Sequence, residues 1–230
     1  MGAACAPQVR GRDDPRSPDL KGRLLVRADS LAPQGADGML GQAWFGGRVW
    51  TFDYPGRRLL LQPLEFKPEQ STAVPVGFPT DADGRPSTHF PSISAQVDGQ
   101  DHWFLFDTGA TAHLSLAARD ALGASERIAT CFVVASVFET WRTAHPEWPV
   151  VHAGDLSVGG QDLIQAPEVT VAGVSVGPVW FARRPDPAFH DDMTSMMDRP
   201  VDGALGGSLL RHFRITVDYP GAVAYFESHD

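Results

Sequence analysis

The chain contains only two cysteines, Cys5 and Cys131, among its 230 residues. Two cysteines form neither a disulfide framework nor a Cys-based zinc site. No apolar run approaches the roughly 18 residues that a membrane helix needs, so no membrane span is expected. Basic residues are also scarce, because 19 Lys and Arg stand against 28 Asp and Glu and give a net charge of −9. This balance, without a basic cluster, argues against a nucleic-acid-binding protein.

Other signatures are missing as well. The eight histidines are scattered and show no His-Glu-x-x-His spacing, so no metal site is expected. Ser115 and Ser208 lack the Gly-x-Ser-x-Gly pattern of a serine hydrolase. Residues 2–5 look like the end of a lipoprotein signal, but no apolar stretch precedes them, and chance is the better explanation.

Apolar and turn-forming residues, by contrast, are plentiful. Apolar residues make up 43% of the sequence, which is enough for a packed core. Glycine (23 residues) and proline (19 residues) indicate many turns and disfavour a helical bundle. We therefore predict a mainly β fold with one or two short helices.

An internal repeat runs through the chain at an offset of 165 residues. The segments Asp37-Gly-Met-Leu-Gly41 and Thr51-Phe-Asp-Tyr-Pro-Gly56 return as Asp202-Gly-Ala-Leu-Gly206 and Thr216-Val-Asp-Tyr-Pro-Gly221. Nine positions between 37 and 56 are identical, whereas random pairing gives about one or two. We predict that the two copies pair as a partial sheet around a pseudo-two-fold axis.

Each copy of the repeat is predicted to contain a β-hairpin. In the second copy, a helix-like stretch over 208–213 precedes strands at 214–218 and 222–226, which a Tyr-Pro-Gly turn connects. In the first copy, residues 57–61 form the closing strand.

The region between the copies carries further signals. Residues 93–97, the turn Asp98-Gly99 and residues 102–106 predict another hairpin. A short helix is expected over 116–122, where Gly123 ends it, and residues 169–176 are expected to pair as a strand with residues 179–182. The stretch from 131 to 153 is ambiguous.

These signals divide the chain into three parts. Residues 1–64 hold the end of a partial first lobe, and residues 87–230 hold a complete second lobe. Residues 65–86 form a linker whose prolines, at 68, 75, 79 and 86, disfavour regular structure.

One motif indicates chemistry. In Phe104-Leu-Phe-Asp107-Thr-Gly-Ala-Thr111 an apolar strand runs directly into Asp-Thr-Gly, and Ala204-Leu-Gly206 follows downstream. With the hairpin before it, this pattern resembles a retropepsin-like aspartic protease of the bacterial type, over residues 88–227. The resemblance implies an acid-protease fold with β-barrel-like lobes and an endopeptidase that uses no metal or organic cofactor.

The resemblance also implies roles for single residues. Asp107 supplies one of two carboxylates, which share a proton and activate a water molecule for attack on a peptide bond. Thr108 bonds to the partner loop and keeps the two carboxylates coplanar, and Gly109 lets the backbone approach the carboxylate closely. Ala110 and Gly206 support the active-site loop.

A flap over the substrate is expected within residues 137–156. Trp141, Trp148 and Gly154 are its candidate members, although core packing accounts for the two tryptophans about equally well. Cys131 lies in an apolar run and is expected in the core.

The dyad needs a second aspartate, but no other Asp-Thr-Gly or Asp-Ser-Gly precedes Asp107. By the repeat offset, the first lobe's aspartate would lie upstream of Met1. Three explanations stay open: a longer natural protein, a homodimer that joins two Asp107 residues, or a catalytically incompetent peptide-binding or dimerisation module. The expected partners are a peptide or protein substrate and a second copy of the chain. The resemblance favours a periplasmic or other extracytoplasmic location, and the sequence itself names no compartment.

Overall fold

The structure is a computed structural model that describes residues 40–228. The described part is mainly β with few short helices, as predicted. Cys5 and the first residues of the repeat, Asp37 and Gly38, lie outside the described residues. No helix within 40–228 is long and apolar enough to cross a membrane.

Most of the elements lie between the two copies of the repeat in the chain. In chain order they are α1 (Gln42–Phe45), β1 (Val49–Asp53), β2 (Arg58–Gln62), β3 (Thr72–Pro75), β4 (Ser92–Val97), β5 (Gln100–Phe106), β6 (Thr111–His113), α2 (Leu116–Leu122), β7 (Arg127–Ala129), β8 (Cys131–Val134), α3 (Ala135–Ala144), β9 (Val150–Asp155), η2 (Leu156–Val158), β10 (Gln161–Ala166), β11 (Val169–Val171), β12 (Val174–Val176), β13 (Val179–Arg184), η3 (Ala188–Met193), η4 (Thr194–Met196), β14 (Gly203–Leu205), α4 (Gly207–Leu210), β15 (Phe213–Asp218) and β16 (Val223–Ser228).

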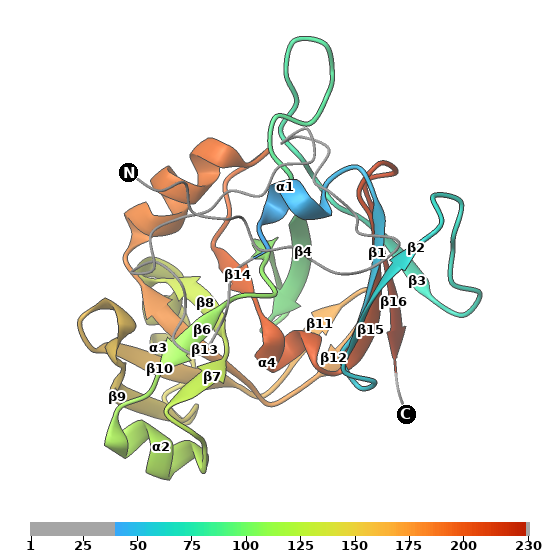
Figure 1. Cartoon of the computed structure of the whole chain (residues 1–230). Coiled ribbons are helices and arrows are strands. Elements are labelled where there is room, and N and C mark those ends of the chain that lie inside the picture. Colours follow the sequence, from blue (N-terminus) through green and yellow to red (C-terminus); the bar gives the residue numbers. More distant parts are fainter. Residues whose placement is uncertain (1–39, 229–230) are drawn as a thin grey trace, which may run out of the picture.

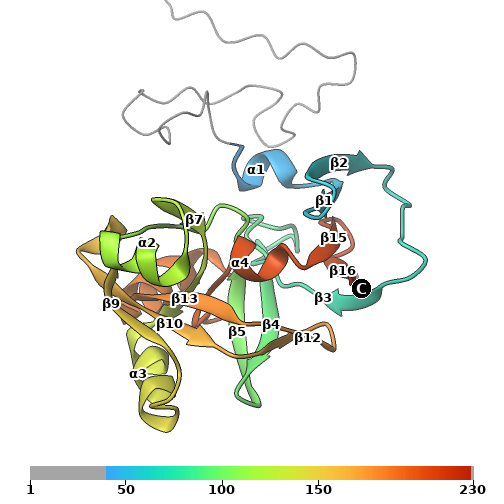
Figure 2. The ribbon, with the colours of Figure 1, turned by 90° about the horizontal axis from the view of Figure 1, so that it is seen from below.

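Two large sheets and a short ribbon organise these strands (Figure 1). The smaller sheet has the order β2-β1-β15-β16-β3, and the larger has the order β12-β11-β4-β5-β14-β8-β13-β10-β9. Strands β6 and β7 pair with each other as the ribbon. Seen from below, the small sheet stands at one side of the molecule, with α1 and α4 next to it (Figure 2).

The predicted pairing of the two repeat copies is confirmed. Strand β1 lies antiparallel to β15, and Thr51 is opposite Thr216. The hydroxyl oxygens of these two residues are 2.7 Å apart. The register is symmetric about this pair, because Trp50 faces Val217 and Phe52 faces Ile215. A pseudo-two-fold axis therefore passes between the two threonines.

The turns of the two hairpins also match. Asp53 accepts a hydrogen bond of 2.8 Å from the Gly56 backbone N–H, and Asp218 accepts one of 2.8 Å from Gly221. The next residue in each copy adopts a positive φ, 52° in the first and 51° in the second. The helices α1 and α4 occupy equivalent positions as well, so the repeat extends beyond the identical residues.

The predicted hairpin and helix of the second lobe are confirmed. Strands β4 and β5 pair antiparallel, and Asp98 and Gly99 turn between them with φ of 53° and 69°. Helix α2 spans Leu116–Leu122; the Ser115 side chain caps its first turn, and Gly123 ends it in the left-handed conformation. The expected pairing of residues 169–176 with residues 179–182 is wrong: β11 pairs with β12 and β4, whereas β13 pairs with β8 and β10.

The linker prediction is wrong in part. Strand β3 lies within 65–86 and pairs antiparallel with β16 at the edge of the small sheet. Pro75 is compatible with this place, because an edge strand can leave a missing N–H on its open side. Residues 65–86 therefore add a strand to the small sheet and are not only a connection between the two predicted lobes.

One hydrophobic core joins the two sheets. It contains Trp50 and Phe52 of β1, Phe104 and Phe106 of β5, and Phe213 of β15, among other buried residues. The Phe52 and Phe106 rings meet edge to face at 5.8 Å. The first copy of the repeat is thus packed directly against the strand that leads to Asp107.

Candidate active site

Asp107 follows the last residue of β5, where a buried strand ends in a tight turn. The strand is anchored on both sides, because Phe106 N–H donates to the Pro91 carbonyl at 2.9 Å and Asp107 N–H donates to the Leu205 carbonyl at 3.0 Å. Strand β14 lies parallel to β5 and antiparallel to β8. The Asp-Thr-Gly loop and the Ala-Leu-Gly element are therefore adjacent, as the resemblance implied.

The carboxyl group of Asp107 is half-buried and held by its own turn. One oxygen, Oδ1, accepts a hydrogen bond of 2.8 Å from Gly109 N–H. Burial raises the pKa of Asp107, and the backbone donors of Gly109 and Ala110 oppose this shift only in part. Such a carboxyl group holds a proton more readily than an exposed aspartate, which suits a general acid or base.

Gly206 is required by the packing beside this loop. A Cβ at Gly206 would overlap the Thr130 carbonyl and would lie 2.7 Å from the Ala110 Cβ. Its φ is −116°, so the requirement comes from close approach and not from a left-handed backbone. Ala110 is buried at the same contact, in keeping with its expected supporting role.

Thr108 and Gly109 are exposed at the tip of the loop. Gly109 also provides the carbonyl that accepts a 2.9 Å hydrogen bond from the Thr111 hydroxyl, which closes the loop on itself. No hydrogen bond of the Thr108 side chain occurs among residues 40–228. The bond to a partner loop that the resemblance implied for Thr108 therefore stays a prediction.

Tyr54, which the sequence analysis did not assign to the site, belongs to the first copy of the repeat and lies near enough to Asp107 to be affected by its charge. Burial raises the pKa of the Tyr54 phenol, and the nearby charge of Asp107 raises it further. Its equivalent, Tyr219, is buried against Phe78 and Phe45, with ring centroids at 5.7 and 6.5 Å. Because the tyrosine belongs to the identical Asp-Tyr-Pro-Gly turns, the repeat was the signal that could have identified it.

Cys131 lies beneath the loop and is fully buried, as predicted. Its Sγ accepts hydrogen bonds from the Ser208 hydroxyl at 3.2 Å and from Gly206 N–H at 3.3 Å. Burial raises the pKa of the Cys131 thiol to about 11, so it stays protonated and is not a nucleophile.

The proposed flap members Trp141 and Trp148 lie elsewhere. Trp141 is on helix α3 and packs edge to face on Phe181 at 5.2 Å, and Trp148 lies 6.2 Å from Trp141. Both are almost completely buried in the main core. The flap assignment of these tryptophans is wrong, and the alternative of core packing holds. The physical reason is their large apolar area, which is buried where Trp141 packs against Phe181 of β13 and His102 of β5 and Trp148 packs against Trp141.

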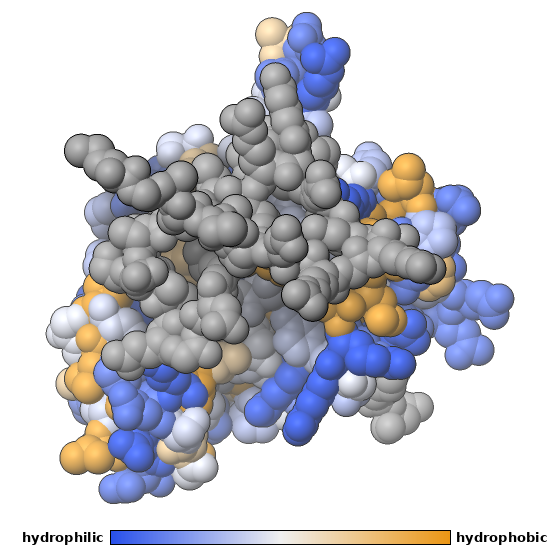
Figure 3. Space-filling model, viewed as in Figure 1, coloured by the Kyte–Doolittle hydropathy of each residue, from blue (hydrophilic) through white to orange (hydrophobic). Residues whose placement is uncertain are grey.

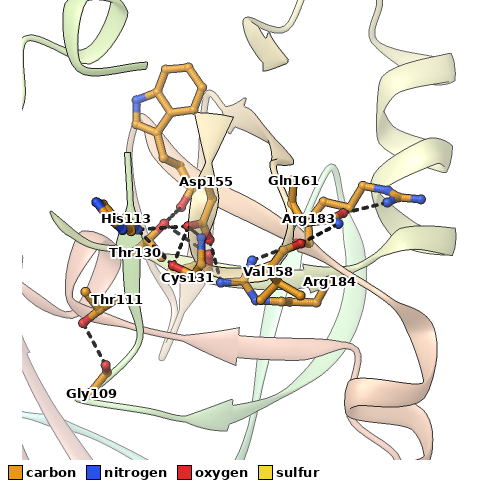
Figure 4. Close-up of polar contacts among 12 residues, drawn as sticks. Gly109, Thr111, His113, Thr130, Cys131, Asp155, Val158, Gln161, Arg183 and Arg184 are labelled. Carbon is orange, nitrogen blue, oxygen red and sulfur yellow. Dashed lines mark hydrogen bonds and ion pairs between the residues drawn. The ribbon is translucent and has the colours of Figure 1, made fainter. Parts of the chain in front are cut away.

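Gly154 belongs to β9 and precedes a buried ion pair (Figure 4). A Cβ at Gly154 would lie 2.6 Å from a Leu163 methyl group, so this glycine is packed and not part of an open loop. The next residue, Asp155, is completely buried and bonds to Arg184 at 2.7 Å. Its Oδ1 also accepts from His113 N–H at 2.9 Å and from the Ser157 hydroxyl at 2.7 Å.

This network fixes the β9–β10 turn to the strand that follows the active-site loop. Desolvation would raise the pKa of Asp155, but the donors of Ser157, His113 and Arg184 outweigh it and leave the pKa below its usual value. Asp155 is therefore a charged structural residue. The sequence carried no signal for it, because its partners come from three separate elements.

No group of three or more His, Cys, Asp or Glu side chains within residues 40–228 is arranged to hold a metal ion. One polar cluster contains two imidazoles and one carboxylate. In it, Asp202 bonds to His102 at 2.9 Å and to His190 at 3.2 Å. The two histidines hold the pKa of Asp202 below its usual value, against the effect of burial. The cluster thus anchors the start of β14.

Comparison with known proteins finds similarity among solved structures. No family model matches the chain, and no curated protein matches it. Among solved structures, the chain is similar to a retropepsin-like aspartic protease from Rickettsia conorii, with a TM-score of 0.37 and 13% sequence identity. The match covers 68% of this chain and 90% of that one.

Proposed function

We propose that the chain is an aspartic endopeptidase component in which Asp107 supplies one carboxylate of a water-activating dyad. The observation that supports this best is the placement of Asp107. Its half-buried carboxyl group ends a strand that neighbouring strands hold on both sides, and its pKa is raised by burial. A dyad needs one protonated and one ionised carboxyl group, and a raised pKa favours the protonated member.

In this mechanism the water molecule lies between the two carboxylates. The ionised carboxylate accepts a proton from the water, whose oxygen attacks the peptide carbonyl carbon, and the protonated carboxyl group donates to the carbonyl oxygen. The carboxyl group that took the proton from water then donates it to the leaving nitrogen as the C–N bond breaks, and the other carboxylate takes back a proton from a hydroxyl of the tetrahedral intermediate. Asp107 can fill either role, since the two groups exchange one proton. The second carboxylate comes from a second copy of the chain or from another lobe.

A second candidate function is a catalytically incompetent peptide-binding or dimerisation module. It is favoured by the single Asp-Thr-Gly loop in the sequence. One carboxyl group alone cannot both accept the proton from water and donate a proton to the carbonyl oxygen. Under this alternative, Asp107 would have no effect on turnover in any assembly.

The test is peptide cleavage at acidic pH, with and without an aspartic-protease inhibitor. The sample must be a form in which a second aspartate can lie opposite Asp107, either an assembly of two copies or a chain with another lobe. Asp107→Asn should reduce kcat/KM by roughly 10²–10⁴-fold or more, because Asn is nearly isosteric but cannot exchange the proton. Asp101→Asn, an exposed position on the same strand, is the matched control and should not alter cleavage. Retained cleavage by Asp107→Asn would contradict the assignment.

A further inference from the structure

His145 follows the last residue of helix α3, and two carboxylates approach the two nitrogens of its ring. Its Nε2 is 2.7 Å from Oδ2 of Asp98, and its Nδ1 is 3.2 Å from Oε1 of Glu147. A neutral imidazole carries a single N–H, so one of the two carboxylates would then meet the lone pair of a ring nitrogen. Only the imidazolium ion, which has a proton on each nitrogen, is attracted to both carboxylates at once.

The ring of His145 is also stacked on an indole. Its plane is 10° from that of Trp148, and the two ring centroids are 4.4 Å apart. An imidazolium ion over an indole gains a cation–π attraction that a neutral imidazole lacks. Trp148 is almost completely buried and packs in turn against Trp141 in the main core. The core therefore holds the indole on which the His145 ring lies.

The contacts of His145 join two segments that are far apart in the chain. Asp98 lies in the turn between β4 and β5, whereas Glu147 and Trp148 belong to the connection between α3 and β9. Figure 2 shows the free end of the β4–β5 hairpin and helix α3 on the same side of the molecule. Helix α1 is on the opposite side, which faces the viewer in Figure 3, so the His145 contacts lie on the far face of that view.

The carboxylate of Asp98 is not required by the turn that it occupies. Asp98 and Gly99 both have positive φ, 53° and 69°. Asn-Gly fits such a two-residue hairpin turn as well as Asp-Gly does, because both residue pairs accept positive φ. What the carboxylate adds to the turn is its ion pair with His145.

The charges that act on His145 are acidic. Asp98 has the largest effect on the pKa of its imidazole and raises it, burial opposes this in part, and Glu147 raises the pKa further. The arginine of the same helix, Arg142, is already paired with Glu139 at 2.6 Å. The surroundings therefore favour the imidazolium form.

The connection after α3 borders open space on its other side. It contributes to a shallow hollow, which is lined by Glu147, Trp148, Pro149, Gln165, Pro167 and Pro178. The side chain of Glu147 is 67% exposed. If its attraction to His145 is lost, Glu147 can turn into the solvent without displacing a packed neighbour.

From this geometry we infer that His145 is an acid-closed latch, which joins the turn between β4 and β5 to the end of α3 through Asp98 and Glu147. The imidazolium ion holds both carboxylates beside Trp148. When the ring loses a proton, one carboxylate loses its N–H partner and the attraction between the two segments disappears. Strand β5 starts just after this turn and ends next to Asp107, so the latch fastens the strand at the end opposite to the candidate active site. The latch does not depend on the proposed function, because its effect is on stability.

A double-mutant cycle of Asp98→Asn and His145→Gln at two pH values tests the latch. The folded-state pKa of His145 lies above its ordinary value of 6.5, so its contribution to stability is fully present below pH 6.5. This contribution is lost as the pH rises through the folded-state pKa. The cycle compares the fall in melting temperature of the double variant with the sum of the falls of the two single variants.

At about pH 5.5 we expect the two substitutions to be non-additive by about 1–3 °C, because either one alone already breaks the same ion pair. At about pH 9 they should be additive within about 1 °C, since the neutral ring no longer attracts Asp98. Non-additivity of equal size at both pH values, or at neither, would overturn the latch.

The matched control is the same cycle on His152→Gln and Asp162→Asn. The ring of His152 is 77% exposed, and its Nδ1 is 3.0 Å from a single carboxylate oxygen of Asp162. This pair should be additive within about 1 °C at both pH values. A pH-dependent coupling as large as that of His145 would mean that any such surface contact behaves in this way, and would overturn the role given to the second carboxylate and to Trp148.

An NMR titration of the His145 ring gives a measurement that does not depend on the stability of the variants. Its ring-proton signal, assigned through its contact with the Trp148 indole, should titrate with a midpoint above 6.5 in the parent chain. In Asp98→Asn the midpoint should fall by about 0.5 or more, because one of the two attracting charges is gone. A midpoint at or below 6.5 in the parent chain, or one that Asp98→Asn leaves unchanged, would overturn the inference.

Discussion

Burial and hydrogen bonding have opposite effects on the pKa of the Asp107 carboxyl group. Burial favours the neutral form, and the N–H groups of Gly109 and Ala110 favour the ionised form. Burial prevails and leaves the pKa raised. Tyr54 of the first copy of the repeat lies near enough for the Asp107 charge to raise its pKa, and only the fold brings these two residues near each other.

The raised pKa of Asp107 has a consequence for stability that depends on pH. Between its unfolded value of 3.8 and the higher folded value, the folded state binds more protons than the unfolded state. Stability from this group is therefore present below that window and is lost as the pH rises through the folded pKa. Asn at position 107 does not ionise, so the Asp107→Asn variant does not lose this stability as the pH rises. Its amide oxygen can still accept the hydrogen bond from Gly109 N–H.

The expected result is that Asp107→Asn melts at a higher temperature than the parent chain at pH 7, and that the difference disappears below pH 3.8. Thermal unfolding of both proteins across this range checks it, because all other titrating groups are shared. A difference that grows toward low pH would mean that the pKa of Asp107 is lowered and not raised.

At the scale of elements, β14 connects the active-site loop to the repeat. Gly206, at its end, would collide with the Thr130 carbonyl if it carried a Cβ, whereas its equivalent Gly41 has nothing within 4 Å of that position. Gly206→Ala should destabilise the fold by about 1–3 kcal/mol, as forced overpacking does. Gly41→Ala should have little effect. Chemical denaturation of the two variants gives the comparison, and equal losses would contradict the close packing of β14.

The β9–β10 turn depends on one buried ion pair. Asp155→Asn leaves the Arg184 charge without its counter-ion, and the two side chains are 0% and 8% exposed. We expect a loss of about 3–5 kcal/mol in the free energy of unfolding. Asp162→Asn, whose partner His152 is 77% exposed, should cost far less. Similar losses for both variants would show that burial of Asp155 has no special role.

The elements that the sequence predicted well are those with local signals. The Asp98-Gly99 turn, the Ser115 and Gly123 caps of α2 and the two Tyr-Pro-Gly turns each depend on a few neighbouring residues. Helix α3 was missed although Phe138 and Trp141 follow a helical spacing, because the motif context favoured a flap there. Strand β3 was missed because prolines dominate its surroundings, and only tertiary pairing with β16 makes it a strand.

The candidate site was predictable in part for the same reason. The Asp-Thr-Gly motif located Asp107, and the resemblance placed the Ala204-Leu-Gly206 element beside it. The Asp155–Arg184 pair could not be predicted, because contacts 29 residues apart between strands leave no local pattern. Which tryptophans face a cleft and which face the core is likewise decided by packing alone.

At the scale of the whole molecule, the distribution of apolar surface predicts how the isolated chain behaves. Because β1 already fills the symmetric position beside β15, a closed dimer through the small sheet is blocked. If the 230-residue chain has the mass of one copy, 24.9 kDa, in light scattering, it should show no inhibitor-sensitive peptide cleavage. A strictly monomeric chain with full protease activity would contradict the requirement for two carboxylates.

The pairing of β1 with β15 also sets the order in which the protein can be completed during synthesis. Thr51 leaves the ribosome 165 residues before Thr216. At about 5–20 residues per second, this interval lasts on the order of 10–30 s. During it β1 lacks its partner strand β15, and Trp50 and Phe52 lack the part of the core that β15 and β16 contribute. The hairpin made first is thus among the last to be fixed, and its apolar side chains stay incompletely covered for that time.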